Sequence, residues 1–472
     1  MIYGNFIGGE WVMSDDIAEV RNPQNDEIVT QYSLASSSMI ESAIASSHEG
    51  AQAMRSLLVY ERAVALLQLR DLLIREQDDF ARTICLETAK PITESRTEVS
   101  RGIQVLTLAA EEAKRITGET IPLDLTPAGT GRIGLTRRFP VGPVTAISPY
   151  NFPLNLGLHK VAPAIAAGCS VIWKPSLLAP GVAFKFAELV QQTRLPKGAF
   201  NVITPTDSNA EPLITDSRMR LLSFTGSAAV GWSLMGKAKG KRTLLELGGN
   251  AAVIVGQDAN LDHAVERCLV GGYAFSGQVC ISVQRILVHK SLIAEFTAKF
   301  LTGVSKLKIG NPMDSDTQIG PMVSDKEANR VEEWITEAVV AGAQVLCGGG
   351  RRGKLIEPTV LTDVSHNTRA WQEELFGPVT ILEPFDTLDE AIELVNESRY
   401  GLQAGIFTND LSATMRAFER LEVGGVIVND VPTFRADNMP YGGVKDSGLG
   451  REGVRYAMKE MTELRLMVLN TK

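Results

Sequence analysis

The chain has 472 residues, with 47 Lys and Arg against 55 Asp and Glu, a net charge of −8 and a pI near 5.4. An acidic balance argues against an extended nucleic-acid-binding face, and 44% hydrophobic with 22% charged residues are typical of a compact protein rather than a disordered one. The longest uncharged apolar run covers only residues 161–173. A membrane-spanning helix needs roughly 20 residues, so we expect no membrane partner.

The N-terminus and the cysteines predict the cellular compartment. No basic region leads into an apolar core at the N-terminus, so we expect no secretory signal. The five cysteines contain no C-x-x-C pair and predict no disulfide framework, which favours the reducing cytoplasm. The five histidines show no metal-binding spacing, and no metal site is expected.

The first third of the chain begins with strands and continues with helices. Residues 6–12 predict two short strands around a Gly-Gly turn. From about 37 to 117 the pattern is helical; in 61–73, apolar residues recur at spacings of three and four. The stretch 118–132 is rich in Gly, Pro and Thr, which indicates a change of domain or an extended arm.

After residue 139, short apolar runs alternate with helical segments. Such alternation is typical of βαβ units and a parallel sheet. A second alternating set runs from 251–255 past 286–288 to 424–428. The sequence therefore predicts an α/β fold, with two α/β domains and an arm. The strands of the first set are expected at 144–147, 170–173, 200–203 and 221–224, and its helices at 154–167, at 181–192 and from Ser227 onward.

Two glycine-rich segments imitate nucleotide-binding motifs. Residues 348–353 match G-x-G-x-x-G, but that motif needs a helix directly after its last glycine. Here 354–358 predicts an extended segment that ends at a proline, so we interpret the glycines as a turn. Neither this segment nor 231–237 has the Ser or Thr that completes a Walker A loop, so no NTPase is predicted.

Three residues are candidates for chemistry. Cys280 follows a Gly277 turn and could act as a nucleophile, although a buried structural cysteine is the common alternative. Glu246 ends an apolar run beside a Gly-Gly turn, where it is either a general base or a solvated loop residue. Asn151 follows another predicted strand and could donate to an oxyanion, or it could simply stabilise a turn.

Seven segments along the chain form a combined pattern: 149–153, 174–176, 224–227, 246–250, 277–280, 374–378 and 441–450. Taken together and in this order, they resemble the aldehyde dehydrogenase superfamily over nearly the whole chain. The resemblance implies a Rossmann-like dinucleotide-binding domain, an α/β catalytic domain and a small β oligomerisation arm. The expected boundaries are 1–117 with 139–246 for the first, 247–446 for the second, and 118–138 with 447–472 for the arm and C-terminal segment.

The resemblance also implies a mechanism. Cys280 attacks the aldehyde, Asn151 and the Cys280 backbone N–H hold the oxyanion, and Glu246 activates the water that hydrolyses the resulting thioester to a carboxylic acid. Lys160 and Glu452 match a proton relay proposed in relatives, although a structural ion pair is an equal alternative. A cysteine esterase and a non-catalytic protein on the same fold remain as other classes, which the retained cofactor and catalytic residues argue against.

NAD or NADP is the implied cofactor. Lys174 is expected to bind the adenosine ribose, Gly226 and Ser227 to present a helix N-terminus to the pyrophosphate, and Glu374 to hold the nicotinamide ribose beside Phe376. Many relatives that prefer NAD have a glutamate where this chain has Leu177, so the electrostatic obstacle to NADP is absent. The remaining expected cofactor-binding residues are Ser148, Tyr150 and Ser176.

The predicted substrate is a small hydroxylated or anionic aldehyde. Tyr150 replaces a common tryptophan and adds a hydroxyl, while His159 and Arg435 fall where relatives line the aldehyde tunnel. Val279 argues against an anionic substrate, because some anion-binding relatives have arginine at this position. Lactaldehyde, glyceraldehyde and short aldehydes with a phosphate, phosphonate, sulfonate or carboxylate group fit; succinate semialdehyde is the main alternative. The family resemblance implies a homodimer or homotetramer.

Overall fold

The computed structural model describes residues 2–471 and begins with two small β elements. Strands β2 (Asn5–Ile7) and β3 (Glu10–Val12) form a hairpin, which confirms the two strands predicted there. Its turn requires left-handed backbone at Gly8 (φ 61°) and Gly9 (φ 89°), which glycine adopts without steric cost. Strands β1 (Ile2–Tyr3), β4 (Ile17–Arg21) and β5 (Ile28–Ser33) form a separate three-stranded sheet.

Four helices follow, as the periodicity of 37–117 predicted. The first begins where the Ser36 hydroxyl accepts a hydrogen bond from the Met39 N–H, a standard N-cap. None of the helices in residues 2–471 combines the length and the apolar character that crossing a bilayer requires. The four are α1 (Ser37–Ser56), α2 (Val59–Arg75), α3 (Gln77–Thr88) and α4 (Ile92–Ala113).

An eight-stranded sheet, in the order β24-β12-β11-β8-β9-β10-β2-β3, forms one half of the molecule. Its five central strands are parallel, and the antiparallel strands are at its edges. In addition to β2 and β3, the sheet contains β8 (Val144–Ile147), β9 (Val171–Lys174), β10 (Phe200–Val202), β11 (Leu221–Thr225), β12 (Arg242–Glu246) and β24 (Gly448–Leu449). The helices between them are α5 (Asn155–Ala167), α6 (Gly181–Gln191), α7 (Glu211–Thr215) and α8 (Ala228–Lys237).

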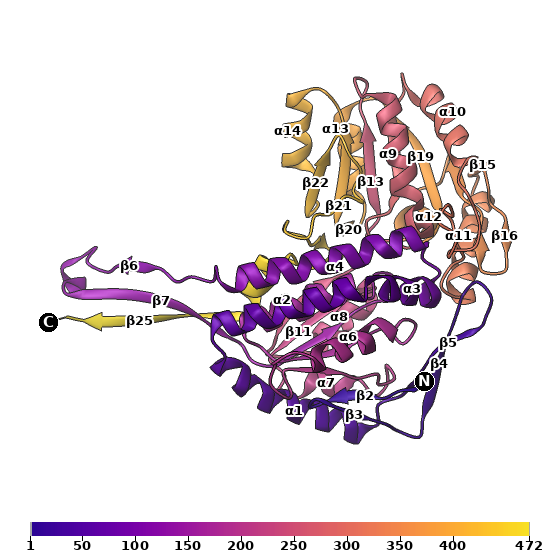
Figure 1. Cartoon of the computed structure of the whole chain (residues 1–472). Helices are drawn as coiled ribbons and strands as arrows, with labels where there is room; N and C mark the ends of the chain where they lie inside the picture. Colours follow the sequence, from indigo (N-terminus) through magenta and orange to yellow (C-terminus); the bar gives the residue numbers. More distant parts are fainter. Residues whose placement is uncertain (1, 472) are drawn as a thin grey trace.

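A seven-stranded sheet, in the order β15-β18-β19-β14-β13-β21-β22, forms the other half, drawn at the top of Figure 1. All its strands are parallel except β15. They are β13 (Ala251–Val255), β14 (Val283–His289), β15 (Gln344–Cys347), β18 (Thr359–Thr362), β19 (Val379–Phe385), β21 (Gln403–Phe407) and β22 (Gly425–Val428). The associated helices are α9 (Leu261–Tyr273), α10 (Ile293–Val304), α11 (Asp325–Val340), α12 (Arg369–Gln372), α13 (Leu388–Asn396) and α14 (Leu411–Arg420).

Both sheets are covered by helices on both faces. Along β9, Val171 and Trp173 pack into one hydrophobic cluster and Ile172 into another on the opposite face, as the two-residue period of a strand requires. Along β13, Ile254 and Val255 alternate between two clusters in the same way. Because both faces are buried, the strands are continuously apolar rather than alternating. The predicted α/β fold is confirmed; the division into domains at the stated boundaries stays a prediction.

The segment 348–353 forms a hairpin and not a phosphate-binding loop. Strands β16 (Arg351–Arg352) and β17 (Leu355–Ile356) pair antiparallel, and Gly353 between them has φ 60°. A strand and not a helix follows the glycines, so the segment lacks the helix that the dinucleotide motif requires directly after its last glycine.

A β arm extends away from the two sheets, toward the left of Figure 1. It consists of β6 (Thr120–Pro122), β7 (Arg132–Pro140) and β25 (Thr462–Asn470), with β7 paired to β25 along its full length. A helix, α15 (Val454–Glu460), precedes β25. Along β25 most side chains are exposed, including Leu464, Leu466 and Val468.

Candidate active site

Three neighbouring strands of the first sheet bring the predicted catalytic and cofactor residues to one edge. β8, β11 and β12 are parallel neighbours, so their carboxyl ends lie side by side. Residues 148–151 follow β8, Gly226 follows β11, and Glu246 is the last residue of β12. In open α/β sheets, ligands bind at this carboxyl edge.

Cys280 comes to this edge from the second half of the molecule, on a strained loop. Five and four positions before it, Phe275 (φ 46°) and Ser276 (φ 53°) adopt left-handed backbone, which costs a non-glycine residue roughly 1–2 kcal/mol. Gly277 also has positive φ, and a Cβ there would lie 2.0 Å from the carbonyl oxygen of Gly377. The missing side chain therefore lets the Cys280 loop pack against the loop that follows Glu374.

A cavity of about 440 Å³ lies where these segments meet. Its size is within the range of small-molecule sites. The cavity wall does not include Ser148, His159, Lys174, Ser176, Leu177, Glu246, Val279 or Arg435. The predicted site residues that do line it are Tyr150, Asn151, Gly226, Ser227, Cys280, Glu374 and Phe376.

The Cys280 thiol is at hydrogen-bonding distance from a tyrosine. Its Sγ lies 3.2 Å from the hydroxyl of Tyr441, which is 161 positions away in the chain. Burial raises the pKa of the thiol to about 11, against a smaller lowering by the Tyr441 hydrogen bond. The thiol is therefore mostly protonated at neutral pH, and attack on a carbonyl requires a base. Tyr441 lies in the segment 441–450 that carries part of the family resemblance, but the sequence predicted no role for this residue.

Asn151 is fixed beside the cysteine loop. Its Nδ2 donates a 2.9 Å hydrogen bond to the carbonyl oxygen of Gln278, and its side chain is buried. The amide has a second N–H, which remains available to an incoming oxyanion. Gln278 also accepts at Oε1 from the Val323 backbone N–H and, at 3.4 Å, from the Tyr150 hydroxyl. The buried Gln278 thus ties the Cys280 loop to Tyr150 and Asn151.

Glu246 is buried without a hydrogen-bond partner. Neither carboxyl oxygen is hydrogen-bonded within residues 2–471, and Gly442, which lacks a side chain, packs directly against Oε1. Burial, and then repulsion from Glu452, raise its pKa well above the ordinary value, while Arg435 and Lys160 oppose this. A buried carboxyl group without a hydrogen-bond partner lowers the stability of the folded protein. Its presence here therefore points to a functional role.

Glu452 occupies the centre of a buried ionic network. Its Oε1 is 2.6 Å from Lys160 Nζ and its Oε2 is 3.1 Å from Arg435. Burial by itself would raise the pKa of Glu452. The nearby positive charges, above all Lys160, outweigh this effect and lower the pKa to about 2. Arg435 in turn lies 3.7 Å above the ring of Tyr441, the tyrosine that contacts Cys280. Lys160 and Glu452 form the ion pair that was one of their two expected roles; a relay role stays a prediction.

His159 and Val279 are packed into the protein rather than exposed in the cavity. His159 Nε2 lies 2.9 Å from Asp437 Oδ1, and burial lowers the pKa of the imidazole. Asp437 also accepts two hydrogen bonds from Arg101, at 3.2 Å from Nε and at 2.8 Å from Nη2. Val279 belongs to a small hydrophobic cluster with Tyr441. The direct substrate contacts predicted for these two residues would need the side chains to move, and they stay predictions.

The residues at the end of β11 fit a dinucleotide phosphate. Ser227 is the exposed N-cap of α8, and Gly226 before it has no side chain to obstruct the helix N-terminus. The Thr225 hydroxyl is buried and has no partner within residues 2–471. Across the cavity, Glu374 Oε1 accepts from the Gly249 N–H at 3.0 Å, and burial raises its pKa to about 7. These groups offer donors and a carboxyl acceptor to a polar ligand.

The other predicted cofactor residues lie at or near the end of β9. Lys174 Nζ is 3.0 Å from the exposed Asp207 carboxylate. Ser176 Oγ accepts from the Leu178 N–H, and Leu177, half-buried, packs against the first hydrophobic cluster. Ser148 Oγ accepts a 2.8 Å hydrogen bond from the Trp173 indole, so its hydroxyl is already engaged. Among residues 2–471, no cluster of His, Cys, Asp and Glu could hold a metal.

Comparison with known proteins defines the class. Residues 11–467 match the model of the aldehyde dehydrogenase family. The chain therefore belongs to the aldehyde dehydrogenase family, and the enzyme class expected from its seven segments is confirmed.

Several curated relatives and solved structures cover almost the whole chain. The chain is 44% identical to 3-sulfolactaldehyde dehydrogenase of Priestia aryabhattai, over 99% of this chain and 98% of the relative, and 40% identical to lactaldehyde dehydrogenase of Methanococcus aeolicus, over 99% and 100%. Aldehyde dehydrogenase 21 of Physcomitrella patens, solved with its product succinate, superposes with a TM-score of 0.98 at 42% identity, over 100% and 98% of the two chains. NADP-dependent glyceraldehyde-3-phosphate dehydrogenase of Bacillus halodurans, solved with NADP, superposes with a TM-score of 0.97 at 33% sequence identity, over 100% of both chains.

Proposed function

We propose that this enzyme oxidises a small hydroxylated or anionic aldehyde to its carboxylic acid, with NAD or NADP, through a thioester on Cys280. The observation that carries this proposal is the meeting of the Cys280 thiol, the Asn151 amide and a helix N-terminus at Ser227 around one cavity. Glu246, buried and unpartnered, lies close enough to contribute to the electrostatics of the thiol.

The first half of the reaction forms a covalent bond to sulfur. The Cys280 thiol transfers its proton to solvent water, and the resulting thiolate attacks the aldehyde carbon, whose C=O π bond opens to give a thiohemiacetal with a negative oxygen. The free N–H of Asn151 and the backbone N–H of Cys280 donate to that oxygen; such donors are typically worth about 3–4 kcal/mol each. A bound nicotinamide dinucleotide supplies the hydride acceptor, so that loss of hydride from the thiohemiacetal leaves a thioester.

The second half hydrolyses the thioester. Ionised Glu246 takes a proton from water as the water attacks the acyl carbon. The C–S bond then breaks, and the proton held by Glu246 passes to the departing sulfur, which releases the carboxylic acid and the Cys280 thiol and leaves Glu246 ionised again. The raised pKa of Glu246 suits this role, because it makes the carboxylate a stronger base than an exposed glutamate. Lys160 and Arg435 keep Glu452 ionised beside it, and that negative charge supports the basicity of Glu246.

The cofactor is held by residues on both sides of the cavity. Gly226 and Ser227 bind the pyrophosphate, and Lys174 binds the adenosine ribose after exchanging its contact with the exposed Asp207. Glu374 accepts hydrogen bonds from the nicotinamide ribose, and the Phe376 ring, edge-on to Tyr150 at 6.2 Å, limits where the nicotinamide can lie.

A small polar substrate is supported by both the chain and its relatives. Arg435 places a buried cation beside Tyr441, and its Nε has no partner within residues 2–471. The two relatives above are a 3-sulfolactaldehyde and a lactaldehyde dehydrogenase. Succinate semialdehyde is the alternative substrate, which the succinate bound to aldehyde dehydrogenase 21 favours.

A panel of aldehydes tests this proposal. We expect kcat/KM for lactaldehyde, glyceraldehyde, 3-sulfolactaldehyde or succinate semialdehyde to exceed that for hexanal by at least about tenfold, since a buried polar site rejects a substrate that leaves it unpaired. The measurement is the absorbance of the reduced nicotinamide with NAD and with NADP. Preference for hexanal over all four polar aldehydes would contradict the proposed substrate class.

The coenzyme preference is tested at Leu177. We expect measurable turnover of the native enzyme with NADP, and we expect Leu177→Glu to lower kcat/KM for NADP about tenfold more than for NAD. Two like charges about 4 Å apart near a surface repel by roughly 4 kcal/mol before screening. Leu177→Gln is the matched control, because glutamine has the same shape as glutamate but carries no charge. Absence of NADP turnover in the native enzyme, or equal losses in both variants, would mean that shape and not charge selects the coenzyme.

We also infer that the enzyme is a homodimer or homotetramer assembled through the arm. The exposed apolar side chains Leu464, Leu466 and Val468 lie on β25, at the edge of the arm sheet. An exposed apolar edge strand is a ready template for pairing with a second chain.

A further inference from the structure

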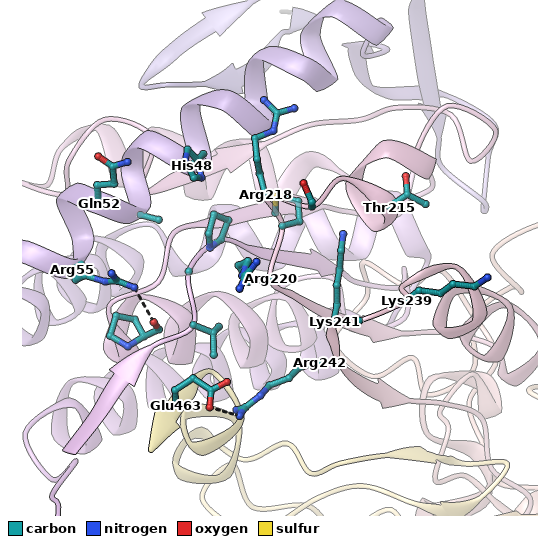
Figure 2. A pocket seen from close by; sticks show the side chains of 18 of the residues that line it. His48, Gln52, Arg55, Thr215, Arg218, Arg220, Lys239, Lys241, Arg242 and Glu463 are labelled. Atoms are coloured by element: carbon teal, nitrogen blue, oxygen red, sulfur yellow. Dashed lines mark hydrogen bonds and ion pairs between the residues drawn. The ribbon is translucent and has the colours of Figure 1, made fainter. Parts of the chain in front are cut away.

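A second cavity, of about 780 Å³, lies at the opposite edge of the first sheet from the catalytic residues (Figure 2). Pro143, Arg220 and Lys241 line it, and these three residues directly precede β8, β11 and β12. Because those strands are parallel, their amino ends share one edge, and the catalytic residues follow the same strands at the other edge. Strands of four or five residues separate the two sites by about 15 Å.

The wall of this second cavity is strongly cationic. His48 also lines it, and Glu463 is the one carboxylate among the described residues of the wall. Such a concentration of positive charge is notable in a chain with a net charge of −8. The seven lysines and arginines of the wall are Arg55, Arg218, Arg220, Lys239, Lys241, Arg242 and Arg465.

Only two of these cations are neutralised by carboxylates. Arg242 pairs with Glu463 at 2.8 Å, and Arg218 pairs with Glu41 and Asp216 at 2.7 and 2.6 Å. Within residues 2–471, the other five cations form no ion pair with a carboxylate: they are Arg55, Arg220, Lys239, Lys241 and Arg465.

Three elements bring the unpaired cations toward one another. Figure 2 shows Arg220 in the middle of the cavity, between Arg55 from α1 and Lys241 from the start of β12. Lys241 is held in place because its Nζ donates to the carbonyl oxygens of Ile214 and Asp216. Arg55 donates weakly, at 3.5 Å, to the carbonyl of Pro140, so its guanidinium is free to bind elsewhere.

We propose that this cavity binds a small organic molecule carrying at least two phosphate charges, at a site separate from the catalytic cavity. Guanidinium groups match phosphate oxygens with two parallel hydrogen bonds, and Arg55 and Arg220 offer two such groups. Val141, Pro143 and Met219 add an apolar surface for the organic part of the ligand. The volume lies within the range of small-molecule sites, and none of the lining residues is shared with the catalytic cavity.

The test measures binding of inorganic pyrophosphate by titration calorimetry. The full-length enzyme is first saturated with the dinucleotide that it turns over, so that the phosphate-binding end of α8 is filled. We expect pyrophosphate to bind, with an affinity that falls as NaCl is raised. The double variant Arg55→Ala/Arg220→Ala should bind at least tenfold more weakly.

Arg75→Ala/Arg194→Ala is the matched control. Both of these arginines are exposed and lie outside the cavity, and within residues 2–471 neither forms an ion pair. This variant should bind pyrophosphate within about twofold of the native enzyme. If thermal melting shows that the cavity double variant is unfolded, Arg220→Ala alone should still weaken binding at least threefold.

Two outcomes would overturn the proposal. One is equal pyrophosphate affinity in the cavity variant and the control, which would place the bound anion elsewhere. The other is no pyrophosphate binding to the native enzyme. If, in that case, the cavity double variant also has a different mass from the native enzyme in sedimentation velocity, then the cations bind an acidic segment of a second copy of the chain and not a small phosphate. Because the readout is binding and not turnover, the result is independent of the proposed aldehyde substrate.

Discussion

Replacement of Cys280 by alanine is expected to abolish aldehyde oxidation, lowering kcat by roughly 10⁴-fold or more, because the bond to substrate carbon forms at this sulfur. Dinucleotide affinity should stay within a few-fold of the native value, since Gly226, Ser227 and Glu374 are unchanged. The measurements are the rate of nicotinamide reduction and fluorescence titration of the reduced cofactor.

The remaining cysteines provide the control for this loss. Cys347 is half-buried in β15, at the far edge of the second sheet, and Cys347→Ala should keep most of the activity. Cys85 and Cys169 are buried in the core, where burial raises the pKa of each thiol to about 12 and about 11. Alanine at either of these positions should also leave turnover largely intact. A Cys280→Ala enzyme that oxidises aldehyde at a near-native rate would refute the covalent mechanism.

Glu246→Gln is expected to slow thioester hydrolysis by roughly 10²–10³-fold and hydride transfer much less, because the variant loses the carboxylate that activates water. Rapid mixing with aldehyde and dinucleotide should show a burst of reduced cofactor, close to one equivalent per Cys280, followed by slow turnover. Glu49→Gln, on the exposed surface of α1, removes one charge without touching the site and should behave as the native enzyme.

The pH dependence of the native enzyme provides a second readout of the same group. The pKa of Glu246 is raised by burial and by the charge of Glu452, and only the ionised carboxylate can accept a proton from water. Turnover limited by hydrolysis should therefore rise with pH through that raised pKa and fall as the carboxyl group is protonated. The slow phase of Glu246→Gln should lack this rise. A uniform loss without a burst would instead assign Glu246 to the first half of the reaction.

The sequence by itself determined part of the secondary structure, the α/β class and the family. The strands expected at 144–147 and 221–224, and the helix from Ser227, are present within one or two residues, because their signals are local: apolar runs, caps and glycine turns. Local sequence also distinguishes the segment 348–353 from a phosphate-binding loop, because residues 354–358 predict an extended segment and not the helix that such a loop requires. Motif order along the chain then identified Cys280, Glu246 and Asn151 as candidates, whose catalytic roles stay predictions.

Only the tertiary structure decided which side chains surround those candidates. Tyr441 meets Cys280 from 161 positions away, and the buried His159 binds Asp437 across 278 positions; its predicted contact with substrate stays a prediction. The cationic cavity has the same origin: parallel strands place Arg220 and Lys241, which precede β11 and β12, at one edge of the sheet, and helix α1 brings Arg55 to the same cavity. Periodicity and motif spacing describe a segment and its own faces, whereas these contacts depend on how distant segments pack, which no local pattern encodes.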